Sequence, residues 1–591
     1  MMARHTTGLT VRVGGQPLPM AWSLALGWAV VEESHRDSAS AELGFRDPGG
    51  ELPARTGLKL GARLEVTAHD GKVTCELFEG EITGCEVRAS ESGTFSAVLA
   101  EDCAHRLKRG RRVAGYQQMS AGEIAAKLAR QAGLKVGTVD RTSLVYDVIT
   151  QPGVSDWEFL THLARENACD VFVRGGALHF RGRAKATGAP ARGTGARQSP
   201  FVLEYGRNLV RVRTGATLRE QVTTVQVRGW DPQRKKELVA DRRIGTTPSR
   251  DVPWKTGERA VRGAPLQLSS APRSSQHEVE AVADAMAQEV AAGLSELEAV
   301  VRGEPRLRLR SAVTLGGLGS RYEGRYTVTS VRHEYHPDTG YLTDLVVREG
   351  TDRAVAGRTG DAEAGLRRIP GMVSAQVVDI KDPKDEGRVK LCFPWLSDDY
   401  VSDWARTVQL GGCKGGGIVV PEVGDEVLVG FEQGSLARPY VIGGLYNGVD
   451  KPPRHRVPLY DKTKGTTNRR SFASKKGHRL ELLDADRGRL GVLVATGDDK
   501  LQIELDQSST RIAIQSNGTV EIEAKRAVSV KGDGITLDAG SGALKLNGTQ
   551  IKLSGTRVDV SGTDVKVSGT GAVKLKGGAL AELSAALVKI N

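Results

Sequence analysis

The stretch IKLSGTRVDVSGTDVKVSG, residues 551–569, carries the pattern that decides the fold of the C-terminal part of the chain. Two apolar side chains separated by one polar residue recur every seven positions, and a glycine follows each pair two residues later. Apolar and polar residues alternate in this way along a strand with one buried face, and glycine permits a corner after it. The pattern therefore predicts a repeat of short strands.

Similar pairs extend through most of the last hundred residues, at spacings of seven to nine. One unit cannot bury its apolar side chains alone, so the units must stack into a solenoid. Either three units of one chain form each coil, or three chains intertwine. Two inward side chains per unit enclose only a thin core, which favours the intertwined trimer. The predicted core residues are Ile512, Ile514, Val520, Ile522, Val528, Val530, Ile551, Leu553, Val558, Val560, Val565 and Val567.

Composition indicates a large, β-rich protein. The chain has 591 residues, of which 39% are hydrophobic and 72 are glycine, as expected for several domains with many turns. Its first residues contain no apolar leader segment, and no run approaches the ~20 apolar residues of a membrane span. We therefore expect synthesis in the cytoplasm without a signal peptide. Six cysteines without CxxC spacing favour buried free thiols over disulfides or a metal site.

The formal net charge of +12 could indicate nucleic acid or an acidic partner. Much of the excess lies in residues 182–197 and 451–470, without aromatic stacking residues or a recognition helix beside them. We expect both segments to be solvated linkers, and we predict no nucleic-acid partner.

The N-terminal region begins with strands and continues with helices. Residues 8–100 alternate in the manner of a small antiparallel barrel. A helix is predicted at 119–134, with Ser120 at its N-terminus in a capping box, and another at 155–168, with Ser155 as its N-cap.

A hairpin turning on Gly175-Gly176 follows at 169–182. A third helix, with an apolar stripe, is predicted at 277–294, and strands lie on both sides of it. The predicted order is therefore barrel, helices, barrel.

Five alternating segments between residues 369 and 447 have the length of strands in a small closed barrel, an OB-like fold. An OB fold alone would suggest single-stranded nucleic acid, but no aromatic residues are interleaved on a basic face. The segments are 372–380, 387–396, 405–411, 426–434 and 439–447.

Residues 146–182 resemble the phage late-control D family, the hub component of contractile tails. The most specific part is Gln151 followed by SDWEFL at 155–160. Residues 324–345 are similar to the second barrel of that family. The resemblance covers about residues 1–355. It implies two related barrels whose trimer forms a pseudo-hexameric ring able to cap a hexameric tube.

The OB-like region resembles the spike barrel shared by phage baseplate proteins and VgrG tip proteins. The matching residues are Asp382-Pro383, GRVK at 387–390, FPW at 393–395, PEVGDEV at 421–427 and GGLYN at 443–447. Hub, OB barrel and needle in this order resemble the fused spike of type VI secretion and extracellular contractile injection systems. Unlike the T-even phage arrangement, the short segment after Asn447 leaves no room for a muramidase. No histidine follows Ile512, so the iron site of some phage spike tips is absent.

The predicted fold is mainly β: two hub β-barrels with helical insertions, an OB-fold barrel, and a C-terminal triple-stranded β-helix formed by an intertwined trimer. The predicted parts are a late-control D-like hub (1–355), a linker (356–368), an OB fold (369–450), a basic connector (451–477) and a repeat β-helix spike (478–591).

The resemblance implies a structural, membrane-puncturing spike that links the inner tube of a contractile injection system to its tip protein. The alternatives are a bacteriophage tail hub with cell-wall hydrolase activity and a trimeric receptor-binding fibre. The particle would be phage tail-like, extracellular or type VI-like, assembled in the cytoplasm or released, with the spike delivered to the target envelope on firing. The implied partners are two further copies of the chain, a hexameric inner-tube protein, baseplate proteins around the hub, a PAAR-like tip protein and effector cargo.

No catalytic residue, cofactor or metal is predicted. Acidic residues such as Asp484, Asp486 and Glu504 fall on polar faces of strands, and no GxSxG, HExxH or P-loop pattern lies between a strand and a helix. Beyond the regular repeat, residues 577–591 are too apolar for a free end. They either plug the trimer core or dock the tip protein. The predicted docking residues are Leu580, Leu583, Leu587 and Ile590.

Overall fold

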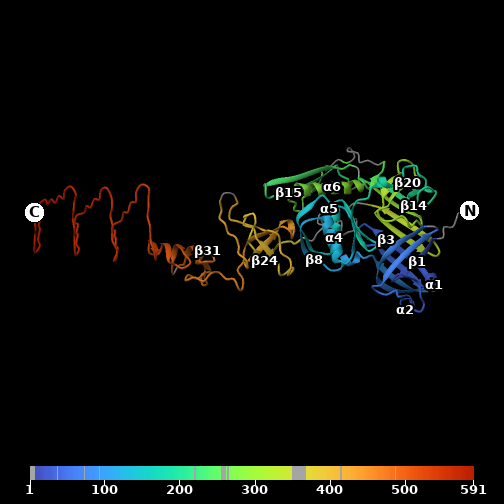
Figure 1. Ribbon diagram of the computed structural model, residues 1–591, viewed down its shortest axis with the longest axis horizontal. Coiled ribbons are helices and arrows are strands. Elements are labelled where there is room, and N and C mark those ends of the chain that lie inside the picture. The colour runs from blue at the N-terminus through green and yellow to red at the C-terminus, as the bar shows by residue number, and fades with distance from the viewer. Residues whose placement is uncertain are drawn as a thin grey trace. The chain divides into compact units, whose positions relative to one another are not determined.

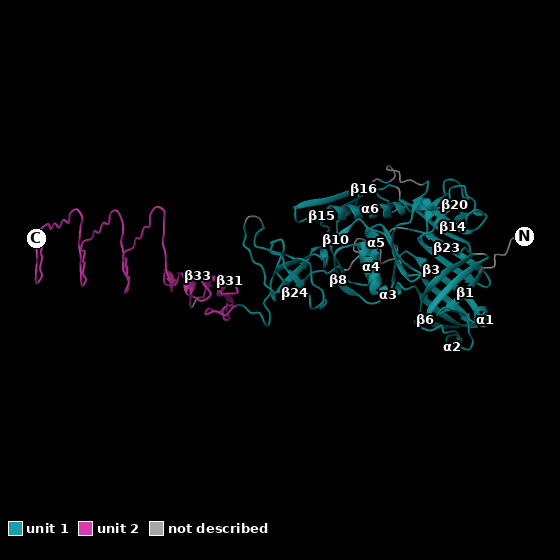
Figure 2. Ribbon diagram, viewed as in Figure 1, with its two compact units in different colours: residues 1–452 teal, residues 453–591 magenta. Residues whose placement is uncertain are grey.

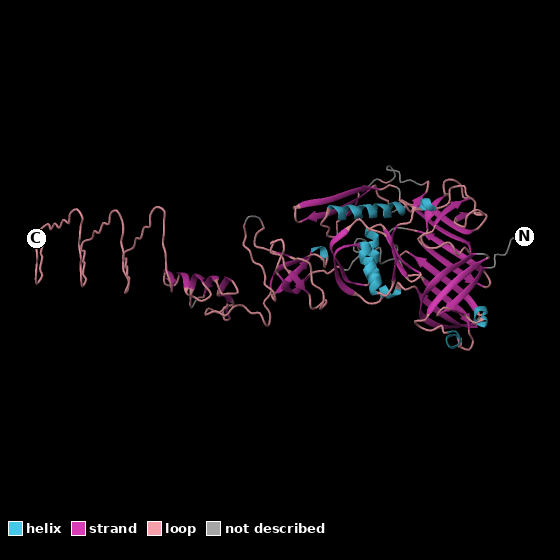
Figure 3. Cartoon of the chain, viewed as in Figure 1, coloured by secondary structure: helices cyan, strands magenta, loops and turns pink. Residues whose placement is uncertain are grey.

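The computed structural model divides into two compact units, residues 1–452 and 453–591 (Figure 2). Strands form most of the regular structure, which confirms the mainly β class (Figure 3). Most of the predicted linker 356–368 lies outside the described residues. The structure describes residues 7–590 apart from 36, 72, 92, 219–220, 246, 254–260, 262–264, 270, 349–367, 413–414 and 486–487.

An eleven-stranded sheet is the framework of the first unit (Figure 1). Its order is β14-β19-β23-β22-β3-β4-β7-β6-β5-β1-β2. The N-terminal strands are β1 (Thr7–Val13), β2 (Gln16–Pro17), β3 (Leu26–Ser34), β4 (Ser40–Arg46), β5 (Arg63–Asp70), β6 (Val73–Ser90) and β7 (Gly93–Glu101). The later strands are β14 (Leu209–Ala216), β19 (Ser295–Arg302), β22 (Ser330–His336) and β23 (Gly340–Val347).

The two predicted barrels are joined through this sheet, because β3 pairs antiparallel with β22 and Ser34 lies opposite Ser330. The sequence did not indicate that the two halves share one sheet. A free strand edge leaves backbone N–H and C=O groups unpaired, and here the edges of the two halves satisfy each other. Each half keeps its own apolar core, one around Leu43 and Phe45 and one around Leu297 and Tyr326.

Two smaller sheets complete the second half of the hub. One consists of β13 (Val202–Glu204), β20 (Ala312–Gly316), β21 (Gly324–Thr327) and β17 (Arg250–Asp251). The other consists of β16 (Lys236–Arg243), β15 (Thr224–Asp231) and β18 (Leu266–Leu268). Helix α6 (Gln276–Ala292) packs on the latter through the buried Val279 and Val282, which confirms the predicted helix and its apolar stripe.

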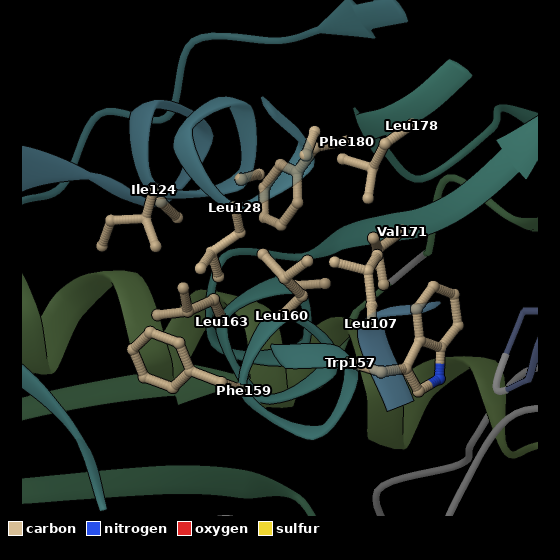
Figure 4. Close-up of a cluster of buried hydrophobic side chains, with 14 of the residues drawn as sticks. Leu107, Ile124, Leu128, Trp157, Phe159, Leu160, Leu163, Val171, Leu178 and Phe180 are labelled. Carbon is tan, nitrogen blue, oxygen red and sulfur yellow. The ribbon is translucent and has the colours of Figure 1, made fainter. Parts of the chain in front are cut away.

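The helical insertion has a core of its own (Figure 4). The predicted capping box is present at Ser120, and the predicted N-cap Ser155 also forms a capping box. The hairpin turns on Gly175 and Gly176 at φ of 56° and 66°. These left-handed angles favour glycine. The elements are α3 (His105–Lys108), β8 (Arg112–Ser120), α4 (Ala121–Gln131), β9 (Lys135–Val139), β10 (Val145–Val154), α5 (Asp156–Glu166), β11 (Cys169–Arg174) and β12 (Ala177–Gly182).

Residues 182–197 are packed rather than solvated, which corrects the first linker prediction. A 3-10 turn, η1 (Ala186–Gly188), buries Ala186, and Ala189 is also buried. The hydroxyl of Thr314 donates to the carbonyl of Pro190 at 2.6 Å. Small alanine and glycine residues let this segment lie against β20, so the composition that suggested a linker in fact permits close packing.

The five predicted OB strands are all present in one sheet, in the order β25-β24-β27-β28-β26. Phe393 of the FPW motif is fully buried in the barrel core. The strands are β24 (Met372–Asp379), β25 (Lys390–Cys392), β26 (Arg406–Thr407), β27 (Glu426–Phe431) and β28 (Pro439–Gly444).

The motif from Asp382 to Arg388 has a structural explanation. The Asp382 carboxylate accepts from the backbone N–H groups of Lys384 and Glu386 at 3.0 and 2.9 Å, and from the Arg388 guanidinium at 2.5 Å. The Asp382 side chain is only 3% exposed. Hydrogen bonding to Arg388 holds the pKa of Asp382 well below its usual range. Between them, Gly387 adopts a φ of +69°. The aspartate therefore organises the loop between β24 and β25.

The second unit contains a five-stranded antiparallel meander: β31 (Arg469–Ala473), β32 (Arg479–Asp484), β33 (Leu490–Ala495), β34 (Leu501–Asp506) and β35 (Arg511–Ser516). It is preceded by the pair β29 (Tyr460–Asp461) and β30 (Thr466–Thr467). The region predicted as repeat spike from residue 478 therefore starts with ordinary hairpins. These form within one chain because tight turns join neighbouring strands.

Part of the basic connector is also packed. Arg469 and His455 both lie beside the carboxylate of Glu481, at 3.7 and 3.0 Å, and Glu481 is only 1% exposed. Val457 packs in the same small core as Leu483. The expectation of a solvated linker at 451–470 is therefore wrong for His455, Val457 and Arg469, which pack against one face of the meander, whereas the other lysine and arginine residues of the segment are exposed.

The cysteines for which the structure gives a state are free, as predicted, but Cys169 is the one classed as buried and Cys85 is exposed. Cys413 lies outside the described residues. The free cysteines are Cys75, Cys85, Cys103, Cys169 and Cys392.

Candidate assembly surface

One face of the meander in the second unit is exposed and apolar. The opposite face carries Glu481, Leu483 and Leu493, which are buried beneath the connector or within the sheet. Because side chains alternate along a strand, the residues between them point the other way. The exposed residues include Phe472, Leu480, Leu482, Val494, Leu501, Ile503, Leu505, Ile512 and Ile514.

Strand register aligns these side chains into two rows that cross the sheet. The first row is Phe472, Leu480, Val494, Ile503 and Ile514. The second is Leu482, Val492, Leu505 and Ile512. Each apolar pair of the sequence thus lies directly opposite the pair on the next strand. Side chains at such opposed positions are in contact range, so the rows form two continuous apolar strips.

Residues 517–590 continue the pair pattern without forming strands within the chain (Figure 3). Their side chains are exposed, and in one unit the exposed fractions are 56% for Val558 and 72% for Val560. The single-chain coil, in which successive units would pair with one another, is not formed in this part of the described chain.

All the predicted core residues are therefore accessible to another molecule. Ile512 and Ile514 lie in the meander, on β35, and the others lie beyond it. The ones beyond are Val520, Ile522, Val528, Val530, Ile551, Leu553, Val558, Val560, Val565 and Val567. Their assignment to a trimer core remains a prediction.

Polar residues of the repeat lie between the apolar ones and carry the charges. Asp559 accepts from Arg557 at 2.9 Å on the surface, and Lys552 and Lys566 occupy the equivalent position in the neighbouring units. In an extended strand this alternation would place the apolar side chains on one side and the polar ones on the other.

The four predicted docking residues at the tip are exposed and are not gathered into a cluster by the single chain. Their role remains a prediction. The residues are Leu580, Leu583, Leu587 and Ile590.

Sequence reasoning missed the part of the surface on β32, β33 and β34. Leu480 and Leu482, Val492 and Val494, and Ile503 and Leu505 repeat the pattern of two apolar residues around a polar or intervening one. Their spacing is wider because hairpin turns separate them, and a search at seven to nine residues excludes them. The sequence feature that could have revealed these residues is the apolar pair itself, without the requirement that pairs recur every seven to nine residues.

Carboxylates singled out in the sequence are engaged in ion pairs. Asp484 lies 2.6 Å from Arg470, and Glu504 lies 3.0 Å from Arg511. Asp486 lies outside the described residues. Across the part of the chain that the structure describes, no group of three or more His, Cys, Asp or Glu side chains is placed to hold a metal ion. No helix in the described ranges has the length and apolarity to cross a membrane.

The fold and the apolar strips together define the class of protein. Residues 373–446 match the family model of the Type VI secretion system/phage-baseplate injector OB domain. Residues 52–336 match the family model described as the Alg8 N-terminal domain. With this OB domain after the hub and before the apolar strips in the chain, the chain is VgrG-like.

Particular relatives agree with that class. The chain is 30% identical over 207 residues to the type VI secretion system spike protein VgrG5 of Pseudomonas aeruginosa, a match that covers 30% of this chain and 26% of the relative. It is 31% identical over 150 residues to the actin cross-linking toxin VgrG1 of Vibrio cholerae, covering 24% of this chain and 13% of that protein. The matches thus span about a quarter or less of these two relatives.

Among solved structures, the half-lidded Francisella PdpA-VgrG complex has a chain of similar fold. The TM-score is 0.52 at 9% identity, and the match covers 86% of this chain and 88% of that chain. At this identity the likeness concerns the fold alone.

Proposed function

We propose that the chain is the spike of a contractile injection system, a homotrimer that links the inner tube to a puncturing needle. The observation that carries the proposal is the pair of apolar strips on the meander, continued by the exposed pairs of residues 517–590. A VgrG-like OB domain lies before this surface in the chain.

Trimer formation follows from the free energy of the exposed side chains. Burying one Val, Leu or Ile side chain contributes roughly 1.5–3 kcal/mol. Such a long apolar edge would otherwise be an aggregation site, and a ladder between chains also pairs its backbone N–H and C=O groups. Three chains, each contributing one apolar edge, enclose a thin core and leave the charged edges in water.

Puncture requires stiffness, and a buried ion pair together with strand pairing braces the hub. Glu33 of β3 accepts from the backbone N–H of Leu309 at 2.8 Å and from the Arg308 Nε at 3.0 Å. Although burial raises the pKa of Glu33, its contacts with Arg308 hold that pKa below the ordinary value. The two halves of the hub are thus joined by backbone pairing and by a buried ion pair, and a thrust on one half passes to the other.

The remaining partners follow from the same proposal. The hub would meet the hexameric inner-tube protein and the surrounding baseplate proteins, and residues 580–590 would take a PAAR-like tip protein, with effector cargo attached to the assembly. The particle would be assembled in the cytoplasm or released, and would act at the target envelope. The spike would act mechanically and not as an enzyme, in line with the description of the Pseudomonas relative as a spike protein.

Sedimentation equilibrium of the full-length chain tests the proposal. The expected mass is three times that of the 63.2 kDa chain, independent of protein concentration over a hundredfold dilution. A soluble monomer of 63.2 kDa would overturn the trimer and leave the exposed strips without a partner. Electron microscopy of particles labelled with an antibody to residues 1–100 should then place the chain at the front of the tube; a label along the sheath would contradict the role as a spike.

A further inference from the structure

The OB barrel carries an apolar arm between β26 and β27, formed by residues 408–412 and 415–419. Leu410 and Ile418 are 77% and 87% exposed, and Val408 and Val419 are also exposed. Large apolar side chains this open to water, gathered on one loop, are typical of an interaction site.

Hydrogen bonds fix the conformation of the two described limbs of the arm. The Gln409 side chain donates to the Val419 carbonyl at 3.1 Å and accepts from the Val419 N–H at 2.8 Å, so that it bridges the two limbs. The backbone N–H of Val408 donates to the carbonyl of Val441 on β28 at 2.8 Å, and this bond fixes the base of the arm to the barrel.

Two glycines let the limbs touch. A Cβ atom on Gly416 would lie 2.3 Å from the Cα of Gly411, and Gly416 also has a φ of +107°. Any other residue would therefore push the limbs apart. An ordered arm loses little conformational entropy when it docks.

The same barrel has a second exposed apolar area, the tryptophan face, made of Met372, Trp395 and Ile442. The indole N–H of Trp395 donates to the Ser374 carbonyl at 2.9 Å, so its polar atom is satisfied while half of the residue stays exposed. Met372 lies opposite Gly430 in the sheet, and the Ile442 side chain lies over Gly430.

We propose that the arm of one chain docks on the tryptophan face of the next chain. Arm and face are different surfaces of one molecule, so the contact is head-to-tail and closes into a ring when the rotation matches the threefold ladder. This inference rests on the proposed trimer and names a contact within it.

The occupant of the face is argued from chain connectivity. The residues from Gly444 to Arg469 span at most about 85 Å when fully extended. Three OB domains tethered to one ladder therefore meet at an effective concentration in the millimolar range. At such a concentration, a small apolar contact between copies is populated in preference to a contact with a dilute partner.

Site-specific photo-crosslinking in the full-length protein tests the inference. With p-benzoylphenylalanine in place of Ile418, irradiation should yield covalent dimers and trimers, and mass spectrometry should map the bond to residues 372–396 or 439–444. Mixing isotopically light and heavy chains before assembly shows whether the bond joins two copies. The matched control has the probe in place of Leu60, an exposed leucine of the N-terminal barrel, and should give no bond to the OB domain.

A reciprocal probe in place of Met372 should reach residues 408–419, and the double variant Leu410→Ser/Ile418→Ser should abolish that bond while the protein stays trimeric. Bonds confined to one chain, or to residues outside the OB domain, in a preparation that sediments as a trimer would overturn the inference and leave the proposed function intact. A monomeric preparation without bonds between chains would overturn both.

Discussion

A carboxylate placed on the apolar edge of the ladder should destabilise the assembly, whereas the same group one residue away should not. Val530 and Ser529 offer this comparison because they are neighbours in one unit, with Val530 on the apolar edge and Ser529 between the apolar residues. Val530 is 71% exposed in the single chain, so the substitution has little effect on a monomer. The destabilisation caused by Val530→Asp is therefore expected in the trimer alone.

The magnitude follows from two terms. Val530→Asp loses roughly 1.5–2 kcal/mol of apolar burial per chain. A carboxylate buried without a cation costs several kcal/mol more, unless it binds a proton. Three such groups meet in one layer, so the trimer should lose on the order of 15 kcal/mol at neutral pH. Ser529→Asp adds the same charge at the solvated edge and should change the stability by less than about 1 kcal/mol.

The assay is resistance of the trimer to SDS and heat, followed by gel mobility and by sedimentation at pH 4.5 and pH 8. A buried Asp has a raised pKa in the trimer, so its neutral form is tolerated at low pH and the destabilisation grows as the pH rises. The Val530→Asp protein should therefore recover part of its resistance at pH 4.5. If Ser529→Asp abolished resistance and Val530→Asp did not, the strand register would be wrong by one residue.

Three further outcomes are expected. Deletion of residues 580–591 should leave a soluble trimer that no longer retains a PAAR-like protein in a pull-down; retention would place the docking surface elsewhere, and loss of the trimer would mean that these residues plug the core. Asp382→Ala should lower the free energy of unfolding of the OB domain by about 2 kcal/mol in denaturant titration, because Arg388 loses its buried partner. This difference between variant and parent should shrink below pH 4, where the carboxylate of the unfolded chain is protonated. Burial lowers the pKa of His333 to about 4, so the unfolded chain binds the extra proton and the hub should lose about 3 kcal/mol of stability as the pH falls from 6.5 to 4. His333→Gln should flatten that slope in thermal unfolding, and an unchanged slope would assign it to other groups.

The features that local sequence predicts are those whose partners are close along the chain. Ser120 and Ser155 cap helices whose capping partners lie three residues further on. The Gly175-Gly176 turn and the five OB strands likewise depend on short-range alternation and turn chemistry. For this reason their positions could be predicted to within a few residues.

The sequence did not indicate features whose partner lies far away along the chain. Nothing in the vicinity of Ser34 indicates that its strand pairs with the strand beginning at Ser330. The basic composition of residues 451–470 suggested solvent, because Glu481, the buried carboxylate that faces Arg469 and His455, comes later in the chain. Charge and polarity alone do not reveal which ions the fold will pair.

The assembly surface depends both on residues close together in the sequence and on residues far apart in it. By itself, the sequence determined that apolar pairs recur at short intervals and that one unit could not bury its pair alone, because the alternation and the glycines are local properties of residues 512–575. Only the tertiary structure decided that the surface begins earlier, on the meander, where Leu480, Val494 and Ile503 meet across strands. The physical reason is register: hydrogen bonding between strands aligns side chains that the sequence keeps many residues apart.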